Sequence, residues 1–263
     1  MTELDMTDPY PNQPSSARIY DYWLGGTHNF EVDRQAAEQV ISVYPEMRYS
    51  AQANRAFLGR AVTFLAQQGI DQFLDIGSGI PTEGNVHEIA HQINPRSRVV
   101  YVDIDPIAVA YSQRILGELP HVVPVVADAR DPDTILEHSQ TRRLIDFNKP
   151  VALLIVAMLH FVPNDTQLHR ILGVFREKMI AGSYLVLSHA SLDGLPPEIG
   201  ARVSAIYAKA TEQFKARTHS DVLQCFGDFD VIDPGLVDAV DWRPNDPNEW
   251  PNKSYYLGGV GRK

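Results

Sequence analysis

The chain has 263 residues, 44% of them hydrophobic, which suffices for one large α/β domain or two small ones with a substantial core. Its net charge of −10 argues against a nucleic-acid partner or an anionic membrane surface, and its single cysteine, Cys225, excludes an intrachain disulfide framework. Because the longest apolar run, residues 151–159, is too short to span a bilayer and the N-terminus is acidic and polar, we expect a soluble cytoplasmic protein with no membrane partner.

The first seventy residues are expected to form an irregular arm followed by a helical region. Three prolines interrupt residues 1–16, and Ser16 is then a suitable N-cap for a helix that Gly25 and Gly26 end. Apolar residues that recur on one face predict a longer helix before the first strand. The three helices are predicted at residues 17–24, 33–43 and 51–68.

From residue 72 onward the apolar pattern alternates between strand and helix, which predicts a parallel, doubly wound α/β sheet. Residues 151–156 are apolar without alternation, as in a central strand covered on both faces. We expect residues 1–70 to form the arm and a helical lid, and residues 71–263 to form the main domain, with an insertion at about 192–226. The strands are predicted near residues 72–76, 98–103, 122–126, 151–157, 183–188, 229–232 and 254–260, and the helices near 83–93, 106–117, 132–138, 165–180 and 197–215.

The most informative motif is the turn after the first predicted strand, where the glycines of residues 77–79 follow Asp75. Glycines let the backbone turn sharply and approach a ligand, and Asp103, at the end of the next strand, can accept hydrogen bonds from both hydroxyls of a ribose. Thr82 replaces the third glycine of a dinucleotide-binding loop, and Asp75 would repel a pyrophosphate but attract a cation. S-adenosylmethionine carries an ammonium and a sulfonium group, so the motif favours this cofactor over NAD.

With these motifs the chain resembles the class I S-adenosylmethionine-dependent methyltransferases, whose Rossmann-like, mostly parallel seven-stranded sheet ends in an antiparallel hairpin. The resemblance implies that Asp128, after the third strand, contacts the adenine and that residues 158–161 lie beside the transferable methyl group. Residues 17–34 and 242–244 are similar to an actinobacterial methyltransferase-like family of unassigned substrate. The expected cofactor-binding residues are Arg18, Tyr22, Asp75, Gly77, Ser78, Gly79, Asp103, Ile104, Asp128, Ala129 and Met158.

Two further roles are expected near the reaction. Arg18 and Tyr22 are four residues apart and share a helix face, so they could close over the cofactor as a lid, with Arg18 on the methionine carboxylate. The alternative is an amphipathic helix that only packs on the domain. His160 is the candidate general base, if the acceptor must lose a proton; the alternative is a hydrogen-bonded structural histidine.

The methyl acceptor is expected to be a small molecule bound near residues 192–226, although a protein side chain stays possible and the oligomeric state is left open. Trp242 and Trp250 would form either a packed loop or an aromatic wall for this acceptor. A protein that binds the cofactor without catalysis, as a sensor, is the second hypothesis.

A zinc hydrolase is the remote alternative, since residues 87–91 spell H-E-x-x-H with His87 and His91 as ligands and Glu88 as base. These residues are predicted on the helix after the glycine loop, with both histidines on its flank and outer face. No third ligand follows at the usual spacing, so we expect no metal site.

Overall fold

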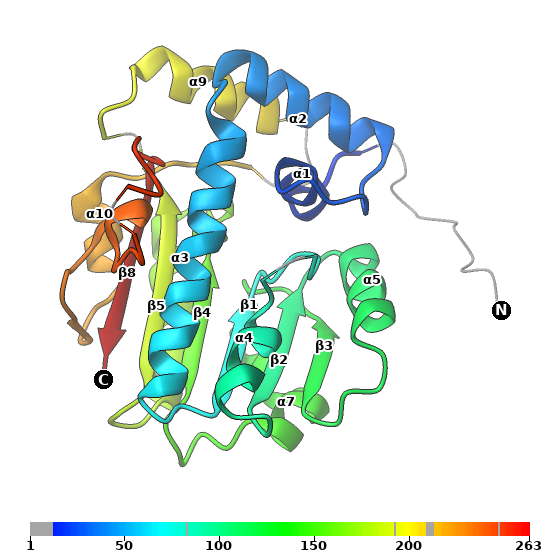
Figure 1. Cartoon of the computed structure of the whole chain (residues 1–263), viewed down its shortest axis with the longest axis vertical. Helices are drawn as coiled ribbons and strands as arrows, with labels where there is room; N and C mark the ends of the chain where they lie inside the picture. Colours follow the sequence, from blue (N-terminus) through cyan, green and yellow to red (C-terminus); the bar gives the residue numbers. More distant parts are fainter. Residues whose placement is uncertain (1–12, 83, 192, 209–212, 247) are drawn as a thin grey trace, which may run out of the picture.

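The computed structural model describes residues 13–82, 84–191, 193–208, 213–246 and 248–263. One sheet forms its centre, with strand order β3-β2-β1-β4-β5-β8-β6, and β7 pairs with β8 (Figure 1). Strands β1 to β5 are parallel, whereas β8 runs antiparallel to β5, β6 and β7. The strands are β1 (Gln72–Ile76), β2 (Arg98–Asp103), β3 (Val122–Val126), β4 (Ala152–Val156), β5 (Tyr184–Ala190), β6 (Asp230–Val231), β7 (Val237–Asp238) and β8 (Tyr256–Arg262).

Two hydrophobic clusters cover the two faces of the sheet, because successive strand residues point to opposite sides. Phe73 and Leu154 pack against α3 and α4 on one face, while Leu74 and Leu153 pack against α6, α7 and α8 on the other. All four side chains are at most 1% exposed, which explains why the central strands are apolar without alternation. The helices named here are α3 (Met47–Gln67), α4 (Val86–Ile93), α6 (Pro132–Glu137), α7 (Ser139–Leu144) and α8 (Asp165–Lys178).

Three helices form a cap above the carboxyl ends of the parallel strands (Figure 1). They are α1 (Ser16–Trp23), α2 (Glu31–Val43) and α9 (Pro197–Tyr207). The remaining helical elements are α5 (Pro106–Leu116), α10 (His219–Gln224) and the short 3-10 turns η1 (Leu159–Phe161) and η2 (Ala239–Asp241). The cap therefore joins the N-terminal helices to the late insertion, which are far apart in the sequence.

The predicted parallel sheet and its antiparallel C-terminal strands are confirmed, and the bounds of β1 to β5 agree with the predictions to within two residues. The sheet has eight strands rather than seven, because the two-residue β7 also pairs with β8. The six-residue helices α7 and α10 were not predicted, since so short a helix carries little periodicity.

The N-terminal predictions need smaller corrections. The N-cap of α1 is Ser15 rather than Ser16. The predicted arm falls largely on residues 1–12, which lie outside the described residues. The predicted 197–215 helix is too long, because α9 ends at Tyr207 and residues 213–215 are not helical, while residues 209–212 lie outside the described residues. No helix within the described ranges is long and apolar enough to cross a bilayer.

Candidate active site

A cavity of about 460 Å³ lies at the carboxyl ends of the parallel strands, beneath the cap. Strand β1 pairs with β2 on one side and with β4 on the other, so the chain order of the strands reverses at β1. Ligands of doubly wound sheets bind in the crevice at such a switch point. The turns after β1, β2, β3, β4 and β5, together with α1, α2, α3, α9 and the start of β8, all contribute to its wall.

The turn after β1 has a backbone that only glycine fits. Gly77 adopts φ of 72°, and a Cβ atom there would lie 2.3 Å from Cγ of Met158. The amides of Gly77 and Ser78 both donate to the carbonyl of Val102, at 2.8 and 3.0 Å. These bonds fix the loop against β2, so that Gly77, Ser78 and Gly79 line the cavity.

Asp103 is held by the backbone on both of its carboxylate oxygens. Oδ2 accepts from the amide of Gly79 at 2.7 Å and Oδ1 accepts from the amide of Asp105 at 2.9 Å. Each carboxylate oxygen has a further lone pair. Asp103 therefore organises the glycine loop and lines the cavity, where its carboxylate could also accept from a ligand.

Asp75 is the buried charge of the site. Its side chain is 5% exposed, and its carboxylate forms no hydrogen bond with another described residue. The pKa of Asp75 is raised to about 7, mainly by burial; Arg55 opposes this shift and the nearby Asp103 carboxylate adds to it. A cationic ligand group beside Asp75 would favour the ionised carboxylate, so this residue fits the ammonium end of S-adenosylmethionine.

Arg55 on α3 is a site residue that the sequence analysis missed. It lines the cavity, and its buried Nε has no hydrogen-bond partner among the described residues. The guanidinium lies 5.8 Å from the ring centroid of Tyr20. Its position in the helix could have indicated this role, because Arg55 shares a face with the buried Ala51 and Leu58. A charged residue on a buried face usually has a charged or polar partner.

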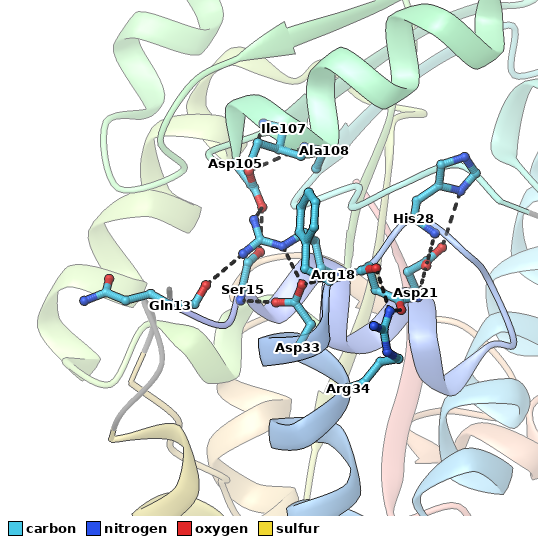
Figure 2. Close-up of polar contacts among 12 residues, drawn as sticks. Gln13, Ser15, Arg18, Asp21, His28, Asp33, Arg34, Asp105, Ile107 and Ala108 are labelled. Carbon is cyan, nitrogen blue, oxygen red and sulfur yellow. Dashed lines mark hydrogen bonds and ion pairs between the residues drawn. The ribbon is translucent and has the colours of Figure 1, made fainter. Parts of the chain in front are cut away.

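Arg18, which was expected to contact the cofactor, is not among the residues that line the cavity. Its side chain is 3% exposed and forms buried ion pairs with Asp33 at 2.8 Å and Asp105 at 3.0 Å (Figure 2). Ser15 joins the same network, donating from Oγ to Asp105 and from its amide to Asp33. Arg18 therefore anchors α1 to α2 and to the turn that follows β2.

Tyr22 is also absent from the cavity wall, because its hydroxyl donates to Glu38 at 2.7 Å and Arg48 stacks over its ring. Residues on the other face of α1 line the cavity instead. They are Ser16, Ala17, Tyr20 and Trp23.

The remaining predicted cofactor residues all line the cavity: Ile104, Asp128, Ala129 and Met158. Asp128 is paired with Arg130, whose Nη2 lies 2.7 Å from Oδ2, and these hydrogen bonds hold its pKa low despite partial burial.

His160, in η1, is 2% exposed and lines the cavity. Burial, with smaller effects from His189 and Arg217, holds the pKa of His160 well below its ordinary value, so the ring is neutral at pH 7. The Ala190 amide approaches its Nδ1 at 3.5 Å, a contact that favours the proton on Nε2. These contacts suit a hydrogen-bond donor better than a base.

The residues of the H-E-x-x-H motif each have a structural partner. His87 Nδ1 is 2.8 Å from the Tyr101 hydroxyl, His91 Nε2 is 2.9 Å from the Ser97 carbonyl, and Glu88 forms a capping box with Asn85. His87 is 8% exposed, so the prediction that it faces outward was wrong. Within the described ranges, no three His, Cys, Asp or Glu side chains are grouped to hold a metal ion.

Trp242 is fully buried and packs edge-on against Phe57 and Phe64, while Trp250 packs against Tyr49. Neither tryptophan lines the cavity, so the packed-loop alternative holds for both.

Comparison with known proteins agrees with this geometry. The S-adenosyl methyltransferase family matches residues 5–263. A candidate methyltransferase from Thermobifida fusca YX is 39% identical, with 99% of each chain covered and a TM-score of 0.91. A DUF574-family protein from Streptomyces avermitilis MA-4680 is 36% identical, with 97% of this chain and 100% of the other covered and a TM-score of 0.92. No curated protein matches the chain.

The match over nearly the whole chain confirms the resemblance drawn from the motifs, and with it the fold and the cofactor. The buried carboxylate of Asp75, the glycine loop and the carboxylate of Asp103 form a binding site that suits S-adenosylmethionine. The chain belongs to the S-adenosyl methyltransferase family, and S-adenosylmethionine is its cofactor.

Proposed function

We propose that this methyltransferase acts on a small molecule enclosed in the same cavity as its cofactor. The observation that carries the proposal is the continuity of the cavity, which extends from Gly77 and Asp103 to a chamber beneath α9. Holding the donor and the acceptor in line can supply roughly 7 to 11 kcal/mol of the barrier. An acceptor that fits beneath the cap would be held beside the donor and so meets this requirement.

Different residues of the cavity would bind different parts of the cofactor. Asp75 faces the ammonium group, Asp103 accepts from the ribose, and Asp128 lies at the adenine end. Arg55 takes the role expected of Arg18, because its guanidinium is in the cavity and can donate to the methionine carboxylate. When bound, S-adenosylmethionine supplies an activated methyl group, whose bond electrons pass to sulfur as the acceptor's lone pair bonds to carbon.

His160 orients the acceptor rather than removing its proton. A protonated His160 would be a buried cation near Arg217, which is unfavourable, whereas the neutral ring can donate from Nε2 to the acceptor's oxygen or nitrogen. A hydroxyl or amine acceptor then releases its proton to water after the new bond forms.

The first test of the proposal is calorimetric titration of the protein with S-adenosylmethionine and S-adenosylhomocysteine. Asp103→Ala should weaken the binding of both ligands. Asp133→Asn, at an exposed carboxylate on α6, is the matched control and should leave both affinities unchanged. Unchanged affinity in Asp103→Ala would overturn the cofactor placement.

The second test uses cofactor with a labelled methyl group and fractionated cell extract. Label in the low-molecular-weight fraction supports a small acceptor, whereas label only in protein or nucleic acid would refute it. Cofactor binding with no transfer to any fraction would favour the sensor hypothesis.

A further inference from the structure

Charge is divided unevenly along the cavity. The described lining residues with a formal charge are Arg55, Asp75, Asp103, Asp128 and Arg130, and all lie on α3 or at the ends of β1, β2 and β3. The part formed by the ends of β4 and β5, the start of β8 and the inner face of α9, called here the acceptor chamber, has no charged side chain among its described lining residues.

Aromatic rings form one wall of the acceptor chamber. Tyr207 and Phe214 are stacked with centroids 5.4 Å apart and planes 21° from parallel, and Phe161 lies 5.4 Å from Tyr207. The His160 ring is 5.3 Å from Phe214 and 6.1 Å from Tyr256. Such rings offer both faces and edges to a flat π system.

Aliphatic side chains also line the acceptor chamber: Ile199 and Val203, on the same face of α9 as Tyr207, and Leu195, just before α9. All three are half-buried, which is expected of side chains that border a cavity. A flat, apolar molecule packed against these residues and the aromatic rings would bury apolar surface.

The buried cation Arg217 does not line the acceptor chamber. Arg217 is 4% exposed and is not a lining residue, and its guanidinium donates to the carbonyls of Leu159 and Val162 and to Asp165. It thereby ties η1, which carries His160, to the segment after α9. A charged acceptor would find no counter-ion in the described wall and would lose its hydration.

Two residues with left-handed backbones border the chamber. Ala157, after β4, has φ of 55°, and Tyr255, before β8, has φ of 56°, although neither is glycine. Such conformations are costly for residues with a Cβ and concentrate at functional sites. Here they turn the chain at the two strand ends that shape the chamber.

We propose that the acceptor is an uncharged molecule with a flat aromatic body, held against the aromatic rings and the aliphatic side chains of α9 with its methylated atom toward Met158. This inference rests on the proposed function, since it assigns the substrate class of the same cavity.

The test is calorimetric titration at pH 7 of protein saturated with S-adenosylhomocysteine, using 2-naphthol, which is neutral, and 2-naphthoate, which is ionised. We expect 2-naphthol to bind at least tenfold more tightly than 2-naphthoate. Phe214→Ala should weaken the binding of 2-naphthol about tenfold, because an aromatic contact is lost. It should leave the affinity for S-adenosylhomocysteine unchanged.

A gain-of-function variant makes the test independent of lost contacts. Val203→Lys adds a cation to the chamber wall and should reverse the preference toward 2-naphthoate. Ala205→Lys, on the exposed face of the same helix, is the control and should leave the preference unchanged.

Failure of the inference and failure of the proposed function give different results. If S-adenosylhomocysteine does not bind, the proposed function falls together with the inference. If it binds but 2-naphthol does not, or if 2-naphthoate binds the unmodified protein equally well, only the aromatic, uncharged acceptor is refuted.

Discussion

Replacing Asp75 by asparagine should stabilise the protein without ligand while removing much of its affinity for S-adenosylmethionine. The carboxylate is 5% exposed, and burial raises its pKa from 3.8 to about 7. The folded protein therefore keeps a proton that the unfolded chain releases between about pH 4 and pH 7. Because the folded state binds more protons in this range, the stability contributed by Asp75 falls as the pH rises and levels off above pH 7.

The size of the pKa shift of Asp75 gives the size of the expected change in stability. A change of about three pKa units corresponds to about 4 kcal/mol as an upper bound on the cost of ionised Asp75 at pH 8. Asparagine has nearly the same shape and does not ionise, so Asp75→Asn should avoid this cost. Removing one partner of a buried charge pair costs at least about 2 kcal/mol of binding, or about 30-fold in the dissociation constant.

Urea denaturation at pH 5 and pH 8 measures the first effect, and calorimetry with S-adenosylmethionine measures the second. We expect the variant to gain stability over the unmodified protein mainly at pH 8. The cofactor affinity of the unmodified protein should rise from pH 6 to pH 8 as Asp75 ionises, whereas the variant should not show this rise. Asp133→Asn, whose carboxylate is 64% exposed, should change stability by less than about 0.5 kcal/mol. A variant that is less stable at pH 8, or that binds the cofactor as before, would refute the reasoning.

Three further substitutions test separate parts of the site. Gly77→Ala should abolish cofactor binding in calorimetry, since its Cβ would collide with Met158 at a left-handed position; Gly173→Ala, which meets no neighbour within 4 Å, should be tolerated. Arg55→Met should weaken the binding of S-adenosylhomocysteine about tenfold but leave the binding of methylthioadenosine, which lacks the carboxylate, unchanged. Equal losses of affinity for both ligands would contradict the assignment. Arg18→Met leaves two buried carboxylates without their cation and should cost about 3 to 5 kcal/mol in urea denaturation, and an unchanged midpoint would show that the network does not anchor the cap.

The sequence was sufficient for the sheet and the cofactor loop because the relevant signals are local. Strand β4 is an uninterrupted apolar run, and the loop after β1 depends on glycines and an aspartate that are adjacent in the chain. Asp103 could be placed because it ends the next strand, and parallel strands end at the same edge of a sheet.

The roles of the helical residues depended on tertiary packing and were predicted less well. Helical spacing showed that Arg18 and Tyr22 share a face but not which face of α1 would meet the cavity. That choice depends on the buried Asp33 on α2 and on Asp105, whose ion pairs hold Arg18 outside the cavity wall. His87 was misplaced for a similar reason, since its buried position depends on the Tyr101 hydroxyl of β2.

The same packing links the cap to the cofactor loop. Asp105 accepts from Arg18 and Ser15 through Oδ2, while its amide donates to Asp103, whose other oxygen accepts from Gly79. Arg18 on α1 is thus connected to Gly79 through two intervening residues, Asp105 and Asp103. A displacement of α1 would break buried ion pairs beside Asp103, which holds the glycine loop, so the position of the cap and the geometry of this loop are coupled.

The two ends of the cavity also differ in how the chain encodes them, which explains why the donor could be predicted and the acceptor could not. The donor end consists of short motifs at the ends of successive strands, where doubly wound sheets bind their ligands. The acceptor chamber is assembled from α9, η1, Phe214 and the start of β8, which are distant in sequence and share no spacing. Its chemistry is defined by the absence of charge among the described residues of that wall, a property that exists only once these segments meet. If the acceptor binds in this chamber as proposed, substrate choice depends on the cap and the late insertion, and it can change while the cofactor motifs stay the same.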